Sequence, residues 1–406
     1  MGKFITGVNY WPAHKAMYWW SQFDSGEIKR DFEQIARLPF AVVRIFLLWE
    51  DFQPDPVNIS QKALTNLRMV ADIASSYGLK LMPTFFCGHM SGINWFPRWM
   101  LKDEWAPQRF PVYSAGCLVN QIIRNYYCDE EVINAQTILI REVCTALKDH
   151  PAIYAYDLGN EASNCVIPPN RKQARHWLEI MSKAIKKYSN GCLLTLGMHA
   201  EDLEEDRHLW PQDAAKYCDF LSMHAYPFYL SWVKQALDAN ILPFMGAITA
   251  WLGGKPVMLQ EFGAPSEPVL EPLLTDSEKS QLQSPLFTEK EVADYYQNAL
   301  ILLKDSNILG ALAWCYSDYA PHLWSKPPLQ QKLHERYFGL MRFDGTAKPS
   351  AAAWAQATNK TLTEKIDISW LAGFEPDHFY TNPRENLIKL YDLYRQQRRH
   401  EISDFI

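Results

Sequence analysis

The chain has 406 residues, of which 48% are hydrophobic and 21% are charged, so it can bury a large core and lacks the composition of a disordered protein. Its net charge of −6 comes without any run of Lys or Arg interleaved with aromatic residues, which argues against nucleic acid as a partner. No uncharged apolar stretch has the length of a membrane span and the first residues do not form a secretion signal, so we expect a cytoplasmic protein without a membrane partner.

Short apolar runs, rich in β-branched and aromatic residues, alternate along the chain with longer stretches of helical periodicity. The alternation occurs about eight times, which is typical of βα units around a parallel sheet. The predicted strands cover residues 4–10, 41–49, 79–86, 152–159, 192–197, 219–226, 256–263 and 308–316.

The segments between these strands have the periodicity of helices. Ile28, Phe32 and Ile35 share one face of the first segment, and the second ends at Gly78, a residue type that commonly follows a helix C-terminus. The predicted helices cover residues 27–38, 64–78, 131–150, 172–188, 290–306 and 348–365, with weaker ones at 213–218 and 244–252 and a charged one in the tail at 384–400.

This order of elements predicts an α/β fold, a (β/α)8 TIM barrel, with a doubly wound open sheet as the alternative. We expect a catalytic barrel over residues 1–365 and a C-terminal extension over residues 366–406 that packs on the barrel or forms a subunit contact in a homo-oligomer. In a barrel, long βα connections meet at the C-terminal rim and wall a cleft or pocket. Four connections are unusually long: 87–130, 227–243, 264–288 and 317–346.

Metal and disulfide chemistry have little support in the sequence. The eight cysteines form no C-x-x-C pair, and four of them lie in or beside apolar strand-like runs, which is typical of buried reduced thiols. The stretch HAEDLEED, which begins at His199, has histidine and acids in a row but lacks the spacing of a metal site, and we interpret it as a solvated loop.

Two glutamates lie in the same way at the ends of apolar strands. Glu161 follows YDLGN at the fourth predicted strand, and Glu261 lies in LQEFG at the seventh. A closed barrel points both into one cavity at its rim. Hydrolysis of an acetal needs a proton for the leaving oxygen and a negative group facing the anomeric carbon, and two carboxyls about 5–5.5 Å apart achieve this with retention of configuration. Either glutamate alone is equally well a helix cap or a salt-bridge acid, but the pair favours catalysis.

The neighbouring residues support unequal roles for the two glutamates. Asn160, beside Glu161, can donate its amide to a sugar 2-hydroxyl. Arg44 and Tyr226, at the ends of the second and sixth predicted strands, can donate to Glu261 and hold it ionised. A buried structural ion pair is the alternative role of Arg44, and it is compatible with that of a donor.

Together these motifs resemble glycoside hydrolase clan A, and family 5 most of all. GNEAS around Glu161 resembles the acid/base motif of the fourth strand, and QEFGAP around Glu261 resembles the nucleophile motif of the seventh. The resemblance covers roughly residues 4–360. It continues with Arg44 in VVRIF, His89 in FCGHM, His224 and Tyr226 in MHAYP, and Trp314 in LAWCY.

The resemblance implies a retaining β-glycosidase in which Glu161 is the acid/base and Glu261 the nucleophile, with neither a metal nor an organic cofactor. A satisfied core histidine is the alternative for His224, and simple core packing is the alternative for Trp314, although an indole at the end of the last strand also offers its face to a sugar ring. The residues implied to bind substrate are Arg44, His89, Asn160, His224, Tyr226 and Trp314.

Aromatic residues crowd the predicted rim, for example in INWFPRWMLKDEW, and sugar rings pack on aromatic faces. Family 5 contains β-mannosidases, β-mannanases and β-glucanases. The resemblance favours an intracellular, exo-acting β-mannosidase on short oligosaccharides, such as mannose linked to N-acetylglucosamine. The alternatives are an endo-β-mannanase, a β-glucosidase or glucanase of the same clan, and a barrel that binds carbohydrate without catalysis.

Overall fold

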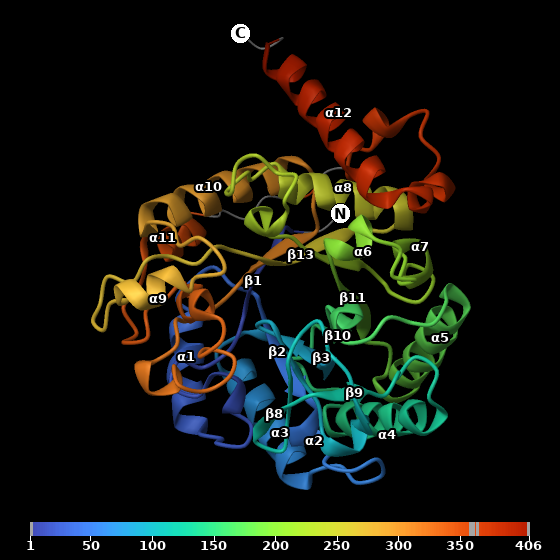
Figure 1. Ribbon diagram of the computed structural model, residues 1–406, viewed down its shortest axis with the longest axis vertical. Helices are drawn as coiled ribbons and strands as arrows, with labels where there is room; N and C mark the ends of the chain where they lie inside the picture. The colour runs from blue at the N-terminus through green and yellow to red at the C-terminus, as the bar shows by residue number, and fades with distance from the viewer. Residues whose placement is uncertain (1–2, 357–361, 363–364, 404–406) are drawn as a thin grey trace.

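The structure, a computed structural model, describes residues 3–356, 362 and 365–403. Eight parallel strands close into a barrel, and the helices form an outer ring around it (Figure 1). This closure confirms the predicted (β/α)8 barrel and excludes the open sheet. In their order around the ring the strands are β1 (Ile5–Asn9), β2 (Val42–Leu48), β3 (Lys80–Cys87), β10 (Ala155–Asn160), β11 (Leu193–His199), β12 (Leu221–His224), β13 (Val257–Phe262) and β14 (Gly310–Ala313).

Most of the helices occupy the predicted segments. Their first turns are stabilised by side chains such as Asp24, Asp129 and Thr288, which accept hydrogen bonds from backbone N–H groups. The helices are α1 (Ser25–Ile35), α2 (Trp49–Phe52), α3 (Gln61–Ser76), α4 (Glu130–Ala146), α5 (Arg171–Tyr188), α6 (Glu201–Glu204), α7 (Pro211–Ala214), α8 (Ile241–Gly253), α9 (Asp276–Ser280), α10 (Glu289–Asp305), α11 (Pro349–Ala355) and α12 (Pro383–Ser403).

Two predicted helices differ from the structure. The one at 213–218 is a single turn, α7, that ends at Ala214. The one at 348–365 is α11, which ends at Ala355, while residues 357–361 and 363–364 of that prediction lie outside the described residues. Short 3-10 helices cover Ala16–Tyr18, Arg98–Met100, Ala162–Asn164, Pro227–Tyr229, Pro321–Leu323, Leu333–Tyr337, Ser369–Leu371 and Pro376–Thr381.

The barrel interior changes from apolar to polar along its axis. Above the apolar end lies a layer with Arg44, Thr84 and Asp157, joined by hydrogen bonds. Gly197 is required beside this layer, because a Cβ there would lie 2.5 Å from the carbonyl oxygen of Gly159 and 3.0 Å from the Arg44 guanidinium. The apolar end is filled by Val42, Met82, Ala155, Phe220, Met258 and Leu312. The polar layer therefore supports the strand ends where the glutamates lie.

The connection at 87–130, predicted as a loop, contains extended structure of its own. Four of its strands form a small sheet in the order β4-β5-β7-β8, and two form a ribbon, β6-β9. Each has only two to five residues, too few for an alternating pattern to be recognised in the sequence. They are β4 (His89–Met90), β5 (Ile93–Trp95), β6 (Leu101–Trp105), β7 (Val112–Ser114), β8 (Cys117–Val119) and β9 (Gln121–Ile123).

The C-terminal segment packs on the barrel beside α8 and then extends away from it as α12 (Figure 1). The Tyr391 hydroxyl donates to Asp238, and the Arg395 guanidinium lies 3.0 Å from the same carboxylate. Tyr380 stacks on Trp210, with ring centroids 4.1 Å apart. The division at residue 365 and the subunit contact stay predictions.

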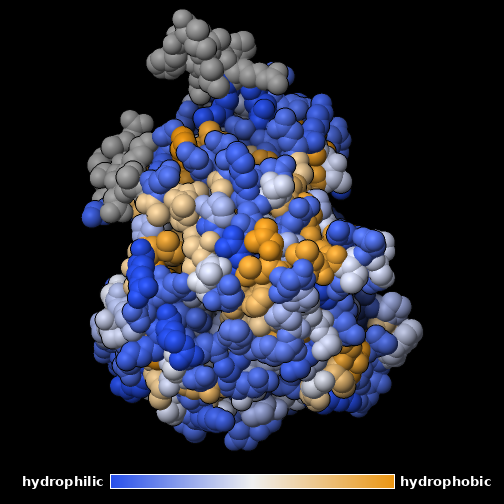
Figure 2. Space-filling view, turned by 90° about the vertical axis from the view of Figure 1, so that its left-hand side faces the viewer, coloured by the Kyte–Doolittle hydropathy of each residue, from blue (hydrophilic) through white to orange (hydrophobic). Residues whose placement is uncertain are grey.

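The face of the molecule shown in Figure 2 is mainly hydrophilic, with hydrophobic residues gathered near its middle. Single exposed hydrophobic side chains such as Val57 and Trp105 are ordinary for a folded protein. Within the described part of the chain, every helix is too short or too polar to cross a lipid bilayer.

Candidate active site

A cavity of about 370 Å³ opens where the barrel strands end, the position of the active site in TIM-barrel enzymes. Seven of the eight predicted site residues line it, and the eighth, Arg44, contacts them from the barrel interior, fully buried. The fold therefore brings all eight predicted site residues together. The seven lining residues are His89, Asn160, Glu161, His224, Tyr226, Glu261 and Trp314.

Glu161 and Glu261 approach each other across the cavity. One carboxylate oxygen of each lies within 4.8 Å of the other. Glu161 directly follows β10, with φ 47° and ψ 45°, a left-handed conformation that few residues with a side chain adopt. Glu261 lies within β13 and not past its end, so the pleat of that strand sets its direction. The spacing is close to that of the paired carboxyls of retaining glycosidases.

Arg44, in β2, holds Glu261 in place from below. Its guanidinium donates to one oxygen of Glu261, to Asp157 at 2.7 Å and to the side-chain oxygen of Asn160 at 2.8 Å. A planar guanidinium with five N–H groups suits this branched set of acceptors. Arg44 is therefore both a buried ion-pair partner and a donor to Glu261, the two roles that the sequence left open.

Replacement of Arg44 by Met is expected to lower the free energy of unfolding by about 3–5 kcal/mol, because it leaves the carboxylates of Asp157 and Glu261 buried without their cation. Urea denaturation of the purified protein measures this change. Arg37→Met is the control, since Arg37 is an exposed residue paired with Glu33 and its loss is expected to cost at most about 1 kcal/mol. Equal stability of the two variants would contradict the role of Arg44.

Tyr226 supplies a second donor to Glu261. Its hydroxyl donates to the other carboxylate oxygen at 3.0 Å, so both oxygens of Glu261 accept hydrogen bonds. Burial raises the pKa of Glu261 above its ordinary value, and the charges of His224 and Arg44 oppose that shift. These donors favour the ionised form of Glu261, as a nucleophile requires.

The hydrogen bonds of His224 indicate the position of a proton in this site. The Gln260 amide nitrogen faces the Asp157 carboxylate at 3.1 Å, so its oxygen must face His224, whose Nε2 donates to it at 3.0 Å. The other ring nitrogen, Nδ1, lies 3.0 Å from Glu161. A hydrogen bond there requires a proton between Nδ1 and the carboxyl oxygen. One proton is therefore held jointly by His224 and Glu161.

The pKa shifts agree with a shared proton. Burial opposes ionisation of Glu161, but the charges of His199, His224 and His89 and the hydrogen bond from His224 lower its pKa. Burial opposes protonation of His224, but Glu261 and the bond with Glu161 raise its pKa. The directions of both shifts thus favour the proton on the imidazole, within hydrogen-bond reach of Glu161.

His89 and Asn160 form the wall beside Glu161. His89 lies in β4, with Nδ1 2.8 Å from the Asn94 side-chain oxygen and Nε2 4.0 Å from the Glu161 carboxylate. The Asn160 amide donates one hydrogen to the backbone oxygen of His89 at 2.9 Å, which fixes the direction of the amide group. Its second N–H remains to serve a ligand hydroxyl, the role that the sequence predicts for Asn160.

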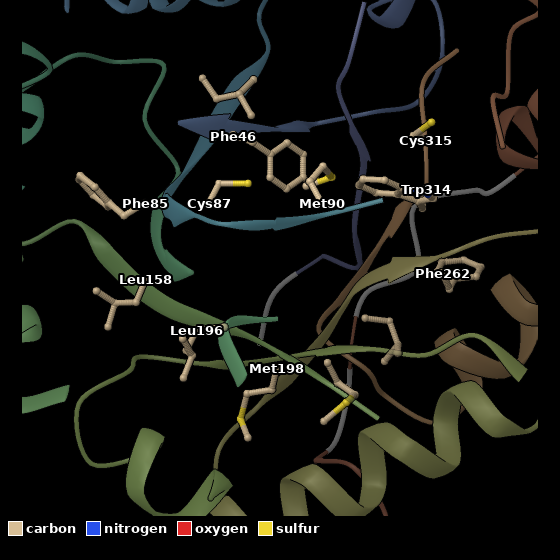
Figure 3. Packing of buried hydrophobic residues seen from close by; sticks show 14 of the residues in the cluster. Phe46, Phe85, Cys87, Met90, Leu158, Leu196, Met198, Phe262, Trp314 and Cys315 are labelled. Atoms are coloured by element: carbon tan, nitrogen blue, oxygen red, sulfur yellow. The ribbon is translucent and has the colours of Figure 1, made fainter. Parts of the chain in front are cut away.

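Trp314 follows β14 and lines the cavity with an almost fully buried indole. The rings of Trp314 and Phe46 meet edge to face, with centroids 5.9 Å apart, and both are labelled in Figure 3. The indole therefore belongs both to the core and to the cavity wall. Its stacking on a sugar ring stays a prediction.

The side chains of Glu161, His224 and Glu261 are also close enough together to hold a metal ion, with ligand atoms within 4.8 Å of one another. Among the described histidines, cysteines and acids, this is the one such set. Both oxygens of Glu261 and both nitrogens of His224 already take part in hydrogen bonds. The guanidinium of Arg44 also lies against the same carboxylate. The set therefore matches a proton-transfer site better than a cation site.

The interpretation of HAEDLEED as a solvated loop is wrong. His199 and Asp202 are buried, and the Ser163 hydroxyl lies between them, 2.9 Å from His199 Nε2 and 2.6 Å from Asp202. Glu201 and Glu204 line the cavity. The segment is the end of β11 followed by α6, and the sequence signal that marks it is His199 at the C-terminal end of a predicted barrel strand.

No protein-family model matches the chain, and no curated protein sequence matches it. A GH5_18 structure from Streptomyces cattleya in complex with GlcNAc is similar with 23% identity and a TM-score of 0.73, over 88% of this chain and 80% of that one. A GH5_18 structure from Bifidobacterium longum in complex with Manb1-4GlcNAc has 22% identity and a TM-score of 0.70, over 87% and 77%.

An exo-beta-1,4-mannosidase from Opitutaceae bacterium strain TAV5 has 24% identity and a TM-score of 0.70, over 87% of this chain and 59% of that one. At these identities the comparison confirms the barrel fold. The similar structures are of the family that the sequence motifs resemble.

Proposed function

We propose that this chain is a retaining β-glycoside hydrolase that removes a terminal β-mannosyl unit from short oligosaccharides. The observation that carries the proposal is the approach of Glu161 and Glu261 to within 4.8 Å in a cavity of about 370 Å³. A water between the carboxyls, as inverting hydrolysis needs, requires about 6.5–9.5 Å, so the spacing supports a covalent intermediate. The cytoplasmic location and the homo-oligomer stay predictions.

In the first step, a carboxylate oxygen of Glu261 attacks the anomeric carbon while the bond from that carbon to the leaving oxygen breaks. The proton shared by Glu161 and His224 passes through the Glu161 carboxyl to the leaving oxygen. The product is an ester between Glu261 and the sugar, with inverted configuration. Arg44 and Tyr226 hold the Glu261 carboxylate before this attack and contact it again when it leaves.

In the second step, water attacks the anomeric carbon of the ester and gives a proton to Glu161. The carboxylate of Glu261 leaves, and the second inversion restores the β configuration. The free amide hydrogen of Asn160 can serve the sugar 2-hydroxyl, a contact that strengthens as positive charge develops on the ring. Glu161 thus acts as an acid in the first step and as a base in the second, while Glu261 is first the nucleophile and then the leaving group, with no net change in the protein.

The structures similar to this chain support the choice of mannose. Several are crystallised with Manb1-4GlcNAc or GlcNAc, and one is named an exo-beta-1,4-mannosidase. The cavity also favours exo action, because loop side chains such as Gln283 and Lys332, which are hydrogen bonded to each other, line it. A pocket walled by such loop side chains suits the end of a chain better than its interior.

A panel of 4-nitrophenyl β-glycosides tests the proposal. We expect kcat/KM for the β-mannoside to exceed that for the β-glucoside, β-galactoside and β-xyloside by at least about tenfold, since one misplaced hydroxyl in a polar pocket costs this much or more. Mannohexaose should release mannose alone. Rapid turnover of the β-glucoside without the β-mannoside would reject the sugar but keep the mechanism, and internal cleavage of mannohexaose would reject exo action.

The raised pKa of Glu261 predicts the pH profile. Because the nucleophile must be ionised, kcat/KM should fall as the pH falls through this pKa, which lies above the ordinary glutamate value of about 4.3. Tyr226→Phe removes a hydrogen bond to the ionised form, so the acidic limb should move to still higher pH. Tyr188→Phe, at the end of α5, is the control that should not move it. An unmoved limb in Tyr226→Phe would contradict the assignment.

A further inference from the structure

Glu335 is a buried acid of the cavity wall that the proposed reaction does not use. It lies in the 3-10 helix Leu333–Tyr337, lines the cavity and exposes 10% of its side chain. One carboxylate oxygen accepts a hydrogen bond from the Ser91 hydroxyl at 3.0 Å. Among the described residues, this is the only hydrogen bond of the Glu335 side chain. A carboxylate has about four acceptor sites. Glu335 therefore faces the cavity with most of its acceptor capacity unused.

Among the described residues, no Lys or Arg forms an ion pair with Glu335. Its other oxygen lies 3.5 Å from Nε2 of His334, but burial lowers the pKa of His334 to about 4, so that ring is neutral at neutral pH. The Lys332 ammonium donates instead to Gln283. Burial is the largest cause that raises the pKa of Glu335 to about 7; Glu261 and Glu161 also raise it, and the Ser91 hydrogen bond and the charge of Lys332 lower it. An unpaired buried acid is costly to the fold, which points to a ligand group as its partner.

The contacts of Glu335 join it to other loops of the cavity wall. Its partner Ser91 comes from the loop after β3, and the neighbouring His334 is hydrogen bonded to Tyr229, at 2.8 Å, from the loop after β12. Nδ1 of His334 is also buried, without a partner among the described residues. Glu335 and His334 therefore belong to the wall of the same cavity as Glu161 and Glu261, where a bound sugar can present a hydroxyl to them.

We propose that Glu335 binds a hydroxyl of the terminal sugar and so determines which sugar the cavity accepts. The proposal rests on the proposed function and names a specificity residue for it. A sugar hydroxyl donates to the unused carboxylate oxygen, which replaces the solvation that burial removes. A sugar with a carboxylate at the same place would meet Glu335, Glu261 and Glu161 together and be repelled.

The test measures kcat/KM of Glu335→Ala and Glu335→Gln on 4-nitrophenyl β-mannoside and on its 3-deoxy, 4-deoxy and 6-deoxy analogues. On the parent sugar, Glu335→Ala should lose about 10- to 150-fold, the effect of one hydrogen bond to a charged group. On the analogue that lacks the bound hydroxyl the loss should shrink to about threefold or less. Glu335→Gln keeps the shape and one acceptor oxygen, so it should recover part of the activity on the parent.

Glu278→Gln is the matched control. Glu278 pairs with Arg336 of the same 3-10 helix, at 3.0 Å, but does not line the cavity, so its loss should leave the sugar preference unchanged. Thermal unfolding of each variant checks that it folds. An equal loss on all four sugars, or no loss in Glu335→Ala, would overturn the proposal while the wild-type turnover still supports the proposed function.

The two proposals fail in different ways. If the wild type cleaves none of the aryl glycosides, the proposed function fails, and calorimetric titration of mannose then tests Glu335 by itself. Weaker binding of mannose to Glu335→Ala than to the wild type and to Glu278→Gln supports the role in sugar binding. The same Kd in all three proteins overturns it.

Discussion

Glu261→Gln should reduce hydrolysis of 4-nitrophenyl β-mannoside by at least roughly 10⁴-fold, the scale on which loss of a covalently reacting group lowers kcat. The amide cannot form the ester that the first step requires, although it has nearly the same shape. The loss should appear in kcat, because both hydrogen-bond partners of Glu261 can still contact the new side chain. Stopped assays over hours measure the residual rate.

Glu267→Gln is the control for this variant. Glu267 is an exposed acid in the loop that follows the same strand, β13, and it should retain wild-type kcat. Equal rates for Glu261→Gln and the wild type would remove Glu261 as nucleophile. They would also favour a barrel that binds carbohydrate without catalysis, with a contaminating enzyme as the source of the measured hydrolysis.

Glu161→Ala should separate substrates by their leaving groups. A disaccharide needs a proton on its leaving oxygen, so its hydrolysis should fall by about 10²- to 10⁴-fold. Formation of the ester from 2,4-dinitrophenyl β-mannoside needs no proton and should be much less affected, but breakdown of the ester then lacks a base and becomes slow. Added azide should accelerate this second step, since azide needs no base, and the product should be β-mannosyl azide.

The stereochemistry of the azide product checks both roles. In Glu161→Ala the azide replaces Glu261 on the ester, so two inversions give the β product. In Glu261→Ala the azide can attack only the substrate itself, so one inversion gives the α product. Undiminished disaccharide hydrolysis by Glu161→Ala, or the same anomer from both variants, would refute the assignment.

The barrel could be predicted from the sequence because each of its strands is marked by a local run of apolar residues. Strands such as β2, VVRIFLL, are buried on both sides and read as nearly continuous apolar runs, and helices with one apolar face follow them. The strands of the 87–130 connection could not be predicted in the same way. Their pairing joins segments of two to five residues, and tertiary contacts, not periodicity, determine it.

The site was predictable where it coincides with strand ends. Arg44, Glu161 and Glu261 are polar interruptions in or just after apolar runs, so the fold alone brings them to one rim. Glu335 carries no such signal. It lies in a long loop, and its hydrogen bond joins it to Ser91, 244 positions earlier in the chain. Only the folded loops show that this acid faces the cavity.

His199 lies between these two cases. It ends β11, where barrel residues face the rim, but the acids that follow it have the composition of a solvated surface. The folded structure nevertheless buries part of this stretch. Asp202 accepts a hydrogen bond from Ser163, and Arg207 forms an ion pair with Glu201. Charge-rich stretches next to barrel strands are therefore poor evidence of exposure.

The left-handed backbone of Glu161 sets the stability of the fold against the proposed catalysis. Conformations of this kind cost of order 1–3 kcal/mol for a residue with a side chain, and glycine adopts them freely. A glycine at 161 would also remove one of two carboxyls that approach each other within 4.8 Å. Any screen that scores melting temperature alone will therefore tend to discard this glutamate, and thermostabilised versions of the protein should be made with position 161 held fixed.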